Sequence, residues 1–141
     1  MLIIFDEWLI HDLRGDNGES KRKETLTFLE KMYDRCDKLV ILEGSPFVQK
    51  FYKLLMKDNR VHIRSISRYL RNYFLLNSDK CVKLSVAQEL PEELKDRIPH
   101  EDRYLYQIRQ TIKQGIIVTT DEELRSLPNT YLRDEFLKEY N

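Results

Sequence analysis

Cysteine is scarce in this sequence, which holds only Cys36 and Cys81 among its 141 residues. The two lie far apart, form no CxxC pair and have no paired histidines at metal-binding spacing near them. The sequence therefore indicates neither a disulfide framework nor a zinc site. We expect two buried, reduced thiols, because free cysteine packs like a small hydrophobic residue.

Long apolar runs are also missing. No stretch approaches the roughly 20 apolar residues that a membrane-spanning helix requires. The apolar stretch at the N-terminus is too short and too acidic for a signal peptide. The sequence therefore predicts a cytoplasmic protein with no membrane partner. Glycine is equally rare, with 4 residues and no GxxxxGKS/T or GxGxxG stretch, which excludes a glycine-rich phosphate-binding loop of either kind.

Neither sign of charge is in excess, since 24 Lys and Arg balance 24 Asp and Glu. Overall charge therefore gives no argument for a nucleic-acid partner, and such an argument has to come from local patches. Hydrophobic residues make up 41% and charged residues 34%, which is typical of a folded protein with a heavily charged surface. We expect residues 1–141 to form a single domain, because a chain of this length buries about 70% of its unfolded surface in one core.

Short continuous apolar runs alternate with helical patterns along the chain. Such runs are typical of buried parallel strands, and they occur at Leu2–Phe5, Leu39–Leu42, Val61–Ile63 and Ile116–Thr119. Helical spacing and capping residues predict helices around Leu26 to Cys36, after Ser45, within SRYLRNYFLL, from Pro99 to Gln114, and from Leu127 to Asn141. KCVKLSV fits either an extra strand or an extended connection. The alternation predicts an α/β fold, a three-layer α/β/α sandwich with a mostly parallel central sheet.

Acidic residues follow three of the predicted strands. Asp6 and Glu7 come directly after the first, Glu43 after the second, and Asp121 begins an acidic triplet after the last. Ligands of open parallel α/β sheets bind at the carboxyl ends of the strands. We therefore expect these carboxylates on one edge of the sheet, and Asp102, in the first turn of the helix after Pro99, is expected to join them.

Carboxylates held this close repel one another unless a cation neutralises them. Hard oxygen ligands suit Mg²⁺ or Mn²⁺, and such an ion supports hydrolysis of a phosphodiester bond. An alternative stays open, because Asp121, Glu122 and Glu123 also suit the first turn of a helix, where acids favour the helix dipole. On that interpretation the chain is a structural or interaction protein whose acids are helix caps.

Three stretches of the sequence carry a family resemblance: LIIFDEWLI, KLVILEGSP and HEDRYLYQIRQTIKQGIIVTTDEEL. In the third, an aspartate that opens a helix is followed 19 residues later by another after a Val-Thr-Thr strand end. With these motifs the chain resembles the PIN domain superfamily, especially its NYN-like branch. The resemblance implies a PIN-like fold and an Mg²⁺- or Mn²⁺-dependent ribonuclease. The matching metal ligands and catalytic residues are Asp6, Glu43, Asp102 and Asp121.

The resemblance also implies candidate partners, and the sequence departs from the family pattern in the helix after the second strand. Toxin-like members act with antitoxins, so an antitoxin or another protein partner is a candidate. Apart from the resemblance, the apolar C-terminal helix makes a homodimer a second candidate. Toxin-type members carry an acid inside the helix after the second strand, whereas PFVQKFYKLLM has none. The alternative function is therefore a catalytically silent PIN-like module that binds RNA or protein.

A basic stretch could hold such a substrate. Arg64, Arg68 and Arg71 are spaced i, i+4, i+7, which places them on one face of a helix. Tyr69, Tyr73 and Phe74 are interleaved with them. Arginines that track a phosphate backbone, beside aromatics that stack on bases, are typical of binding to single-stranded RNA, and the expected partner is single-stranded or structured RNA. In the alternative interpretation Tyr73 and Phe74 are core and the arginines pair with surface acids.

Overall fold

The computed structural model describes residues 1–140 and contains one open sheet of five parallel strands in the order β3-β2-β1-β4-β5. Each strand is short, and the three central ones are almost wholly buried. The strands are β1 Leu2–Phe5, β2 Lys38–Leu42, β3 Cys81–Leu84, β4 Ile116–Thr119 and β5 Thr130–Leu132.

Helices connect the first four strands in chain order, and a loop with a single 3₁₀ turn connects β4 to β5. The α-helices are α1 Trp8–Arg14, α2 Glu19–Asp34, α3 Pro46–Lys50, α4 Val61–Leu70, α5 Glu92–Lys95, α6 Arg103–Ile112 and α7 Arg133–Tyr140. Two π-helical segments, η1 Phe51–Met56 and η2 Arg71–Leu75, continue α3 and α4, and two 3₁₀ turns are η3 His100–Asp102 and η4 Glu122–Leu124.

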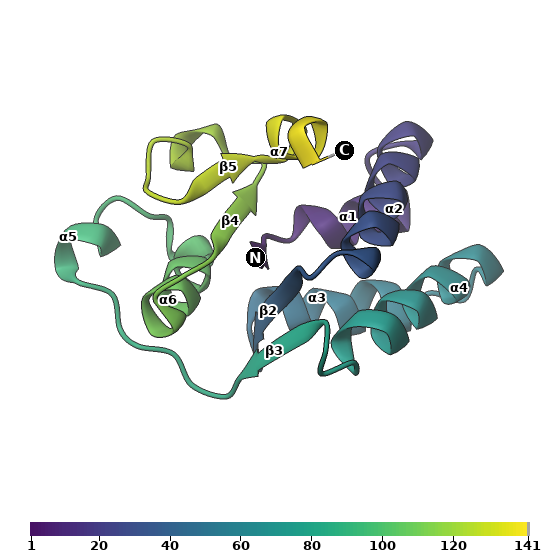
Figure 1. Ribbon diagram of the computed structural model, residues 1–141, viewed down its shortest axis with the longest axis horizontal. Coiled ribbons are helices and arrows are strands. Elements are labelled where there is room, and N and C mark those ends of the chain that lie inside the picture. The colour runs from purple at the N-terminus through teal and green to yellow at the C-terminus, as the bar shows by residue number, and fades with distance from the viewer. Residues whose placement is uncertain (141) are drawn as a thin grey trace.

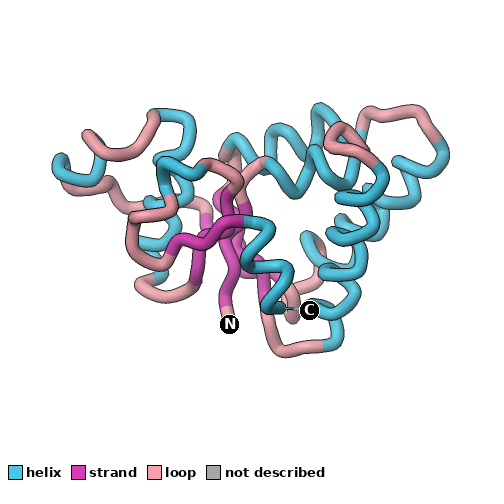
Figure 2. The backbone as a smooth tube through the Cα atoms, turned by 90° about the horizontal axis from the view of Figure 1, so that it is seen from above, coloured by secondary structure: helices cyan, strands magenta, loops and turns pink. Residues whose placement is uncertain are grey.

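The helices form a layer on each face of the sheet, so the molecule is a three-layer α/β/α sandwich, as predicted (Figure 2). Helix α6 packs against β1, β2 and β4, whereas α7 packs against β4, β5 and α2. Helices α2 and α4 project from the sheet in the same direction (Figure 1). Helices α1 and α6 matter for the candidate site, because each begins beside the carboxyl ends of the central strands.

Several predicted elements differ in the structure. The strand expected at Val61–Ile63 is wrong, because these residues begin α4, whose apolar side chains recur at helical spacing and bury Ile63. Helix α1 was not predicted, because its seven residues are too few for the apolar spacing of a helix to show in the sequence. KCVKLSV contains the edge strand β3.

The predicted tail helix, Leu127 to Asn141, is wrong in its first part, which contains β5 before α7 begins at Arg133. Its last residue, Asn141, lies outside the described residues. The expectation for the cysteines holds for only one of them, because Cys36 is exposed after α2 while Cys81 is buried in β3. Burial raises the pKa of the Cys81 thiol to about 11.

The core is built around aromatic side chains between the sheet and one helical layer. Phe28 of α2 is fully buried and meets Phe5 and Phe136 edge to face, with ring centroids 5.8 and 5.7 Å apart. Burying one such side chain contributes about 2–3 kcal/mol. This contact fixes α2 and α7 against β1, the strand that carries Asp6 at its end.

A buried ion pair joins three helices in the same layer. Arg133, 2% exposed, donates from Nε to Asp12 Oδ2 at 2.7 Å, and Asp12 is 1% exposed. The hydroxyl of Thr25 donates to the same carboxylate oxygen at 2.9 Å, and Asn17 donates to the other at 2.7 Å. Arg133 also lies over the ring of Trp8, 5.6 Å from its centroid. The pair thereby holds α7 against α1 and α2.

None of the helices formed by residues 1–140 combines the length and the hydropathy needed to cross a membrane.

Candidate functional site

Three of the four predicted site carboxylates line one cavity at the carboxyl edge of the sheet. The cavity has a volume of about 420 Å³ and lies where β1 and β4 end and where α1 and α6 begin. Its lining is mostly polar and charged, and the residues are Asp6, Glu7, Trp8, His11, Asn17, Lys21, Glu101, Asp102, Thr120 and Asp121. The expectation that Asp6, Asp102 and Asp121 meet at one edge is therefore confirmed.

Asp6 is the most deeply placed of these carboxylates. Its side chain accepts hydrogen bonds from the Glu7 backbone N–H at 2.7 Å and from the Thr119 hydroxyl at 2.8 Å. The residue is only 9% exposed. Burial raises the pKa of Asp6, the two hydrogen bonds lower it, and the nearby charges of Glu7 and Asp121 raise it further. The net effect is a raised pKa, so a nearby cation would stabilise the ionised form of this carboxyl.

Thr119 is a site residue that sequence reasoning missed. Besides holding Asp6, its hydroxyl oxygen accepts a hydrogen bond from the Asp121 backbone N–H at 3.1 Å. It is fully buried at the end of β4 and so joins the ends of two neighbouring strands. The sequence did contain a signal for this residue, because Thr119 is a hydroxyl-bearing residue at the end of a buried apolar strand, two positions before Asp121.

Asp121 serves two purposes at once. It is the N-cap of η4, and its Oδ1 accepts from the Glu123 backbone N–H at 3.0 Å. This is the capping role that the sequence left open as an alternative. The same residue lines the carboxylate cavity, and within residues 1–140 its other carboxylate oxygen has no hydrogen-bond partner. Capping and participation in the site are therefore compatible.

Asp102 ends η3 and leads directly into α6. Burial and the negative charges of Asp6, Glu101, Asp121 and Glu7 raise its pKa to about 7. A carboxyl so strongly perturbed by several like charges is typical of a functional site. It stays half protonated near neutral pH until something positive displaces the proton.

Tyr104 adds a second unusual group beside the carboxylates. It is 6% exposed, and its hydroxyl has no hydrogen-bond partner among the described residues. Burial and the charges of Asp6, Glu7 and Asp102 raise its pKa. Leaving a buried hydroxyl without a partner costs about 1–3 kcal/mol. Such a group is expected where a ligand or an ordered water completes the hydrogen bonding.

Glu43, the fourth predicted ligand, does not line the carboxylate cavity. It directly follows β2, the neighbour of β1 in the sheet, so it lies on the same edge. Its side chain is exposed. Glu43 therefore stands outside the group formed by Asp6, Asp102 and Asp121.

A lysine sits at one side of the cavity. Lys50 Nζ lies 2.9 Å from Glu7 Oε2 and 3.1 Å from His11 Nε2, and His11 Nδ1 lies 2.8 Å from Asp16 Oδ2. An ammonium group can only donate, so His11 Nε2 accepts and Nδ1 carries the ring proton that is donated to Asp16. Glu7 is thus neutralised by Lys50, and sequence reasoning missed this lysine.

The carboxylates do not form a ready-made cage. In the part of the chain that the structure describes, no three His, Cys, Asp or Glu side chains stand close enough together to enclose a metal ion. Mg²⁺ is bound through one or two carboxylates with several waters retained, so a closed cage is not required for it. The oxygen donors of the cavity and the raised pKa of Asp102 suit such a hydrated cation.

The predicted arginine stripe lies on α4 and at the start of η2. Arg64, Arg68 and Arg71 are all exposed, and none forms an ion pair within residues 1–140. Tyr73 is 50% exposed beside them, with its ring 5.1 Å from that of Tyr69. The alternative interpretation is therefore wrong for the arginines and for Tyr73, but it is confirmed for Phe74, which is fully buried. Shallow hollows along this face share no residue with the carboxylate cavity.

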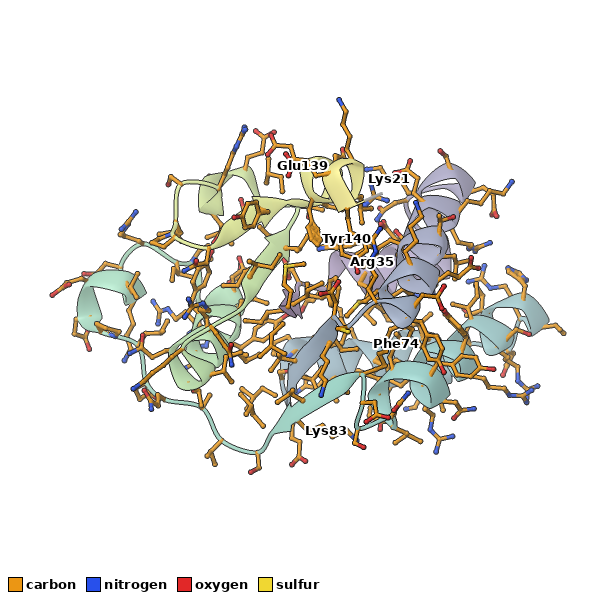
Figure 3. The ribbon with its side chains drawn as sticks, viewed as in Figure 1. Lys21, Arg35, Phe74, Lys83, Glu139 and Tyr140 are labelled. Carbon is orange, nitrogen blue, oxygen red and sulfur yellow. The ribbon has the colours of Figure 1, made fainter. Side chains whose placement is uncertain are left out.

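A larger cavity, of about 560 Å³, opens at the opposite edge of the sheet. Arg35 and Tyr140, the last residue of α7, lie together there (Figure 3), with the guanidinium 4.3 Å from the ring centroid. Arg35 also donates to the Tyr140 carbonyl, and the Tyr140 hydroxyl donates to Asp37. Because these polar groups satisfy one another, the smaller carboxylate cavity is the better candidate for chemistry.

Comparisons of this chain with known protein families, with characterised proteins and with solved structures gave no match.

Proposed function

We propose that the protein is a PIN-like, metal-dependent ribonuclease that hydrolyses phosphodiester bonds at its carboxylate cavity. The observation that carries this proposal is the meeting of Asp6, Asp102 and Asp121 from three separate segments in one cavity. A helix cap or a solvated surface position can account for a single acid. Neither accounts for the fold keeping Asp6 and Asp102 partly buried while the charges of neighbouring acids raise their pKa values. A divalent cation removes the repulsion between these charges.

The residues present fit such an ion. One or two of the carboxylates of Asp6, Asp102 and Asp121 would hold it together with water molecules, with Glu43 at the same edge as an outer carboxylate. When bound, Mg²⁺ or Mn²⁺ supplies activation of water and charge neutralisation at the departing oxygen. No side chain is assigned as general base.

The chain's own residues prepare this site. The Thr119 hydroxyl and the Glu7 backbone N–H fix both oxygens of the Asp6 carboxylate, so its position is set before any ligand arrives. The carboxyl of Asp102 gives up its proton near neutral pH as positive charge approaches. Lys50 holds the Glu7 carboxylate at 2.9 Å and keeps it from competing for the cation.

RNA is the proposed substrate because the exposed face of α4 combines cations with aromatic rings. Arg64, Arg68 and Arg71 would track phosphates, and Tyr73 offers a ring for stacking on an unpaired base. This face is separate from the carboxylate cavity, so it would bind a part of the strand away from the bond that is cut.

The test is cleavage of end-labelled single-stranded and hairpin RNA with Mn²⁺, with Mg²⁺ or with EDTA. The wild type is compared with Asp102→Asn and with Glu122→Gln, which removes an exposed acid that does not line the cavity. Cutting that requires metal, is lost in Asp102→Asn and persists in Glu122→Gln supports the proposal. No cutting, or equal cutting by all three proteins, overturns it.

One observation favours a second candidate, a catalytically silent PIN-like module that binds RNA or a protein such as an antitoxin. This observation is the lack of a preformed three-ligand group among residues 1–140. Titration calorimetry distinguishes the two candidates, because a silent module takes up neither Mg²⁺ nor Mn²⁺ at millimolar concentration.

A further inference from the structure

A second hollow adjoins the carboxylate cavity, and Glu7 lines both. This hollow, of about 260 Å³, lies along α3 and the start of η1. It differs from its neighbour in charge, because its only other charged groups are lysines. Its lining residues are Glu7, Pro46, Gln49, Lys50, Lys53 and Leu54. We call the surface formed by Gln49, Lys50 and Lys53 the lysine face.

The polar groups of the lysine face differ in how firmly they are held. Lys50 is bound to Glu7 and His11, both of which line the carboxylate cavity. Gln49 donates to the Gly44 carbonyl at 2.9 Å, which fixes its side chain over the loop after β2. Lys53 is exposed and pairs with no acid in the part of the chain that the structure describes. The face therefore offers one anchored cation at the cavity and one free cation farther along.

An acidic cavity alone repels the phosphates of a nucleic acid. Positive charge close to the acids offsets this repulsion and raises the local concentration of an anionic substrate. Lysine is a point-charge phosphate binder that needs no fixed geometry. Lys50 is well placed for this role because its ammonium already lies at the boundary between the two hollows.

We propose that the substrate strand crosses the lysine face as it enters the carboxylate cavity, with Lys50 and Lys53 binding the phosphates next to the bond that is cut. This inference rests on the proposed ribonuclease function and deepens it by naming where the backbone is held. The arginines of α4 then contact a more distant part of the strand. Glu7 lies between the lysine face and the carboxylate cavity, because it lines both hollows. Its ion pair with Lys50 neutralises its charge.

The test measures binding separately from cleavage. A fluorescently labelled single-stranded RNA of about 12 nucleotides is titrated with protein in EDTA, and anisotropy gives the Kd at several salt concentrations. Lys50→Gln and Lys53→Gln are compared with Lys57→Gln, the next lysine on the same segment, which is exposed and does not line the hollow. Arg64→Gln is measured alongside, and thermal melts check that each variant is folded.

We expect Lys50→Gln and Lys53→Gln each to raise the Kd by about 3- to 10-fold and to reduce the slope of log K against log salt by about 0.7, the value for one phosphate contact with a single strand. Lys57→Gln should change neither quantity. An unchanged Kd in Lys53→Gln, an equal loss in Lys57→Gln, a loss confined to Arg64→Gln, or no RNA binding by the wild type would each overturn the proposal. If the two lysine variants weaken binding while the wild type cuts no RNA, the lysine face stands and only the nuclease function fails.

Discussion

The hydroxyl of Thr119 donates a 2.8 Å hydrogen bond to the Asp6 carboxylate, linking the ends of β4 and β1. Both groups are buried, so water does not compete for this bond. The same oxygen accepts from the Asp121 backbone N–H at 3.1 Å. One small side chain therefore sets the relative positions of two of the carboxylates that line the cavity.

Thr119→Val keeps the shape of this side chain and removes both hydrogen bonds. We expect the free energy of unfolding to fall by about 1–3 kcal/mol, because a buried carboxylate and an amide lose a partner. The affinity for Mn²⁺ should also fall, because Asp6 is no longer fixed. Urea denaturation and calorimetric titration measure the two effects.

Thr120→Val is the matched control for stability, since Thr120 is exposed and follows Thr119 directly, but it does not control for the Mn²⁺ affinity because Thr120 lines the carboxylate cavity. It should alter stability by less than about 0.5 kcal/mol. Equal effects of the two substitutions on stability would contradict the role assigned to Thr119.

Asp102 makes stability depend on pH in a defined direction. An ordinary aspartate loses its proton near pH 3.8, whereas burial and neighbouring acids raise the pKa of Asp102 to about 7 in the folded protein. Between these values the folded state binds more protons than the unfolded state, so the free energy of unfolding falls as pH rises. Asp102→Asn cannot ionise and should stabilise the metal-free protein, by an amount that grows from about pH 5 to about pH 8.

Thermal melts in EDTA at both pH values test this expectation, with Glu122→Gln controlling for the change in net charge. A stabilisation by Asp102→Asn that is the same at both pH values would contradict it.

The same pKa makes metal binding depend on pH. With a pKa of about 7, Asp102 is about one tenth ionised at pH 6 and about nine tenths ionised at pH 8. A cation has to displace the remaining proton, so the affinity for Mn²⁺ should be about tenfold higher at pH 8. Calorimetric titrations of the wild type at both pH values measure this ratio. A pH-independent affinity would show that Asp102 is not a ligand.

The carboxylate edge could be predicted from the sequence because its signals are local. A buried apolar run followed at once by an acid marks a strand end, and this pattern correctly placed Asp6 and Asp121. The helix start after Pro99 likewise placed Asp102 beside them. These inferences need only the parallel arrangement of the strands, which the alternation of apolar runs and helices predicted.

Other features could not be predicted because they depend on contacts between distant residues. Lys50 reaches Glu7 across 43 positions of the chain only because α3 folds back beside α1. Val61–Ile63 was mistaken for a strand since a short apolar run fits either structure, and only the packing of Ile63 decides between them. The partnership of Asp12 with Arg133 has no local signal at all.

The Asp12–Arg133 pair is expected to be essential for stability. Asp12→Asn removes the one fully buried counter-charge of the Arg133 guanidinium and leaves it only the exposed carboxylates of Asp134 at 2.6 Å and Glu24 at 3.2 Å, and breaking a buried ion pair costs about 3 kcal/mol or more. The double replacement Asp12→Leu with Arg133→Met removes both charges and should recover much of that loss, because apolar side chains of similar volume avoid the desolvation penalty. Urea denaturation of the three proteins tests this, and a loss below about 1 kcal/mol for Asp12→Asn would show the pair to be dispensable.

Tyr104 provides a test that separates structure from function. Tyr104→Phe removes a buried hydroxyl that has no partner within residues 1–140, so we expect the metal-free protein to be stabilised by about 1 kcal/mol. The rate of RNA cleavage should nevertheless fall, because the hydroxyl is near enough to feel the charges of Asp6 and Asp102, and an ordered water can bond to it beside the cavity that these acids line. Tyr106→Phe is the matched control, since Tyr106 lies on the same helix and its hydroxyl is bonded to Thr130 at 2.8 Å. That variant should lose about 1 kcal/mol and keep its cleavage rate. If Tyr104→Phe instead lowers stability and leaves cleavage unchanged, the Tyr104 hydroxyl only stabilises the core. It then gives no support for a ligand in the carboxylate cavity.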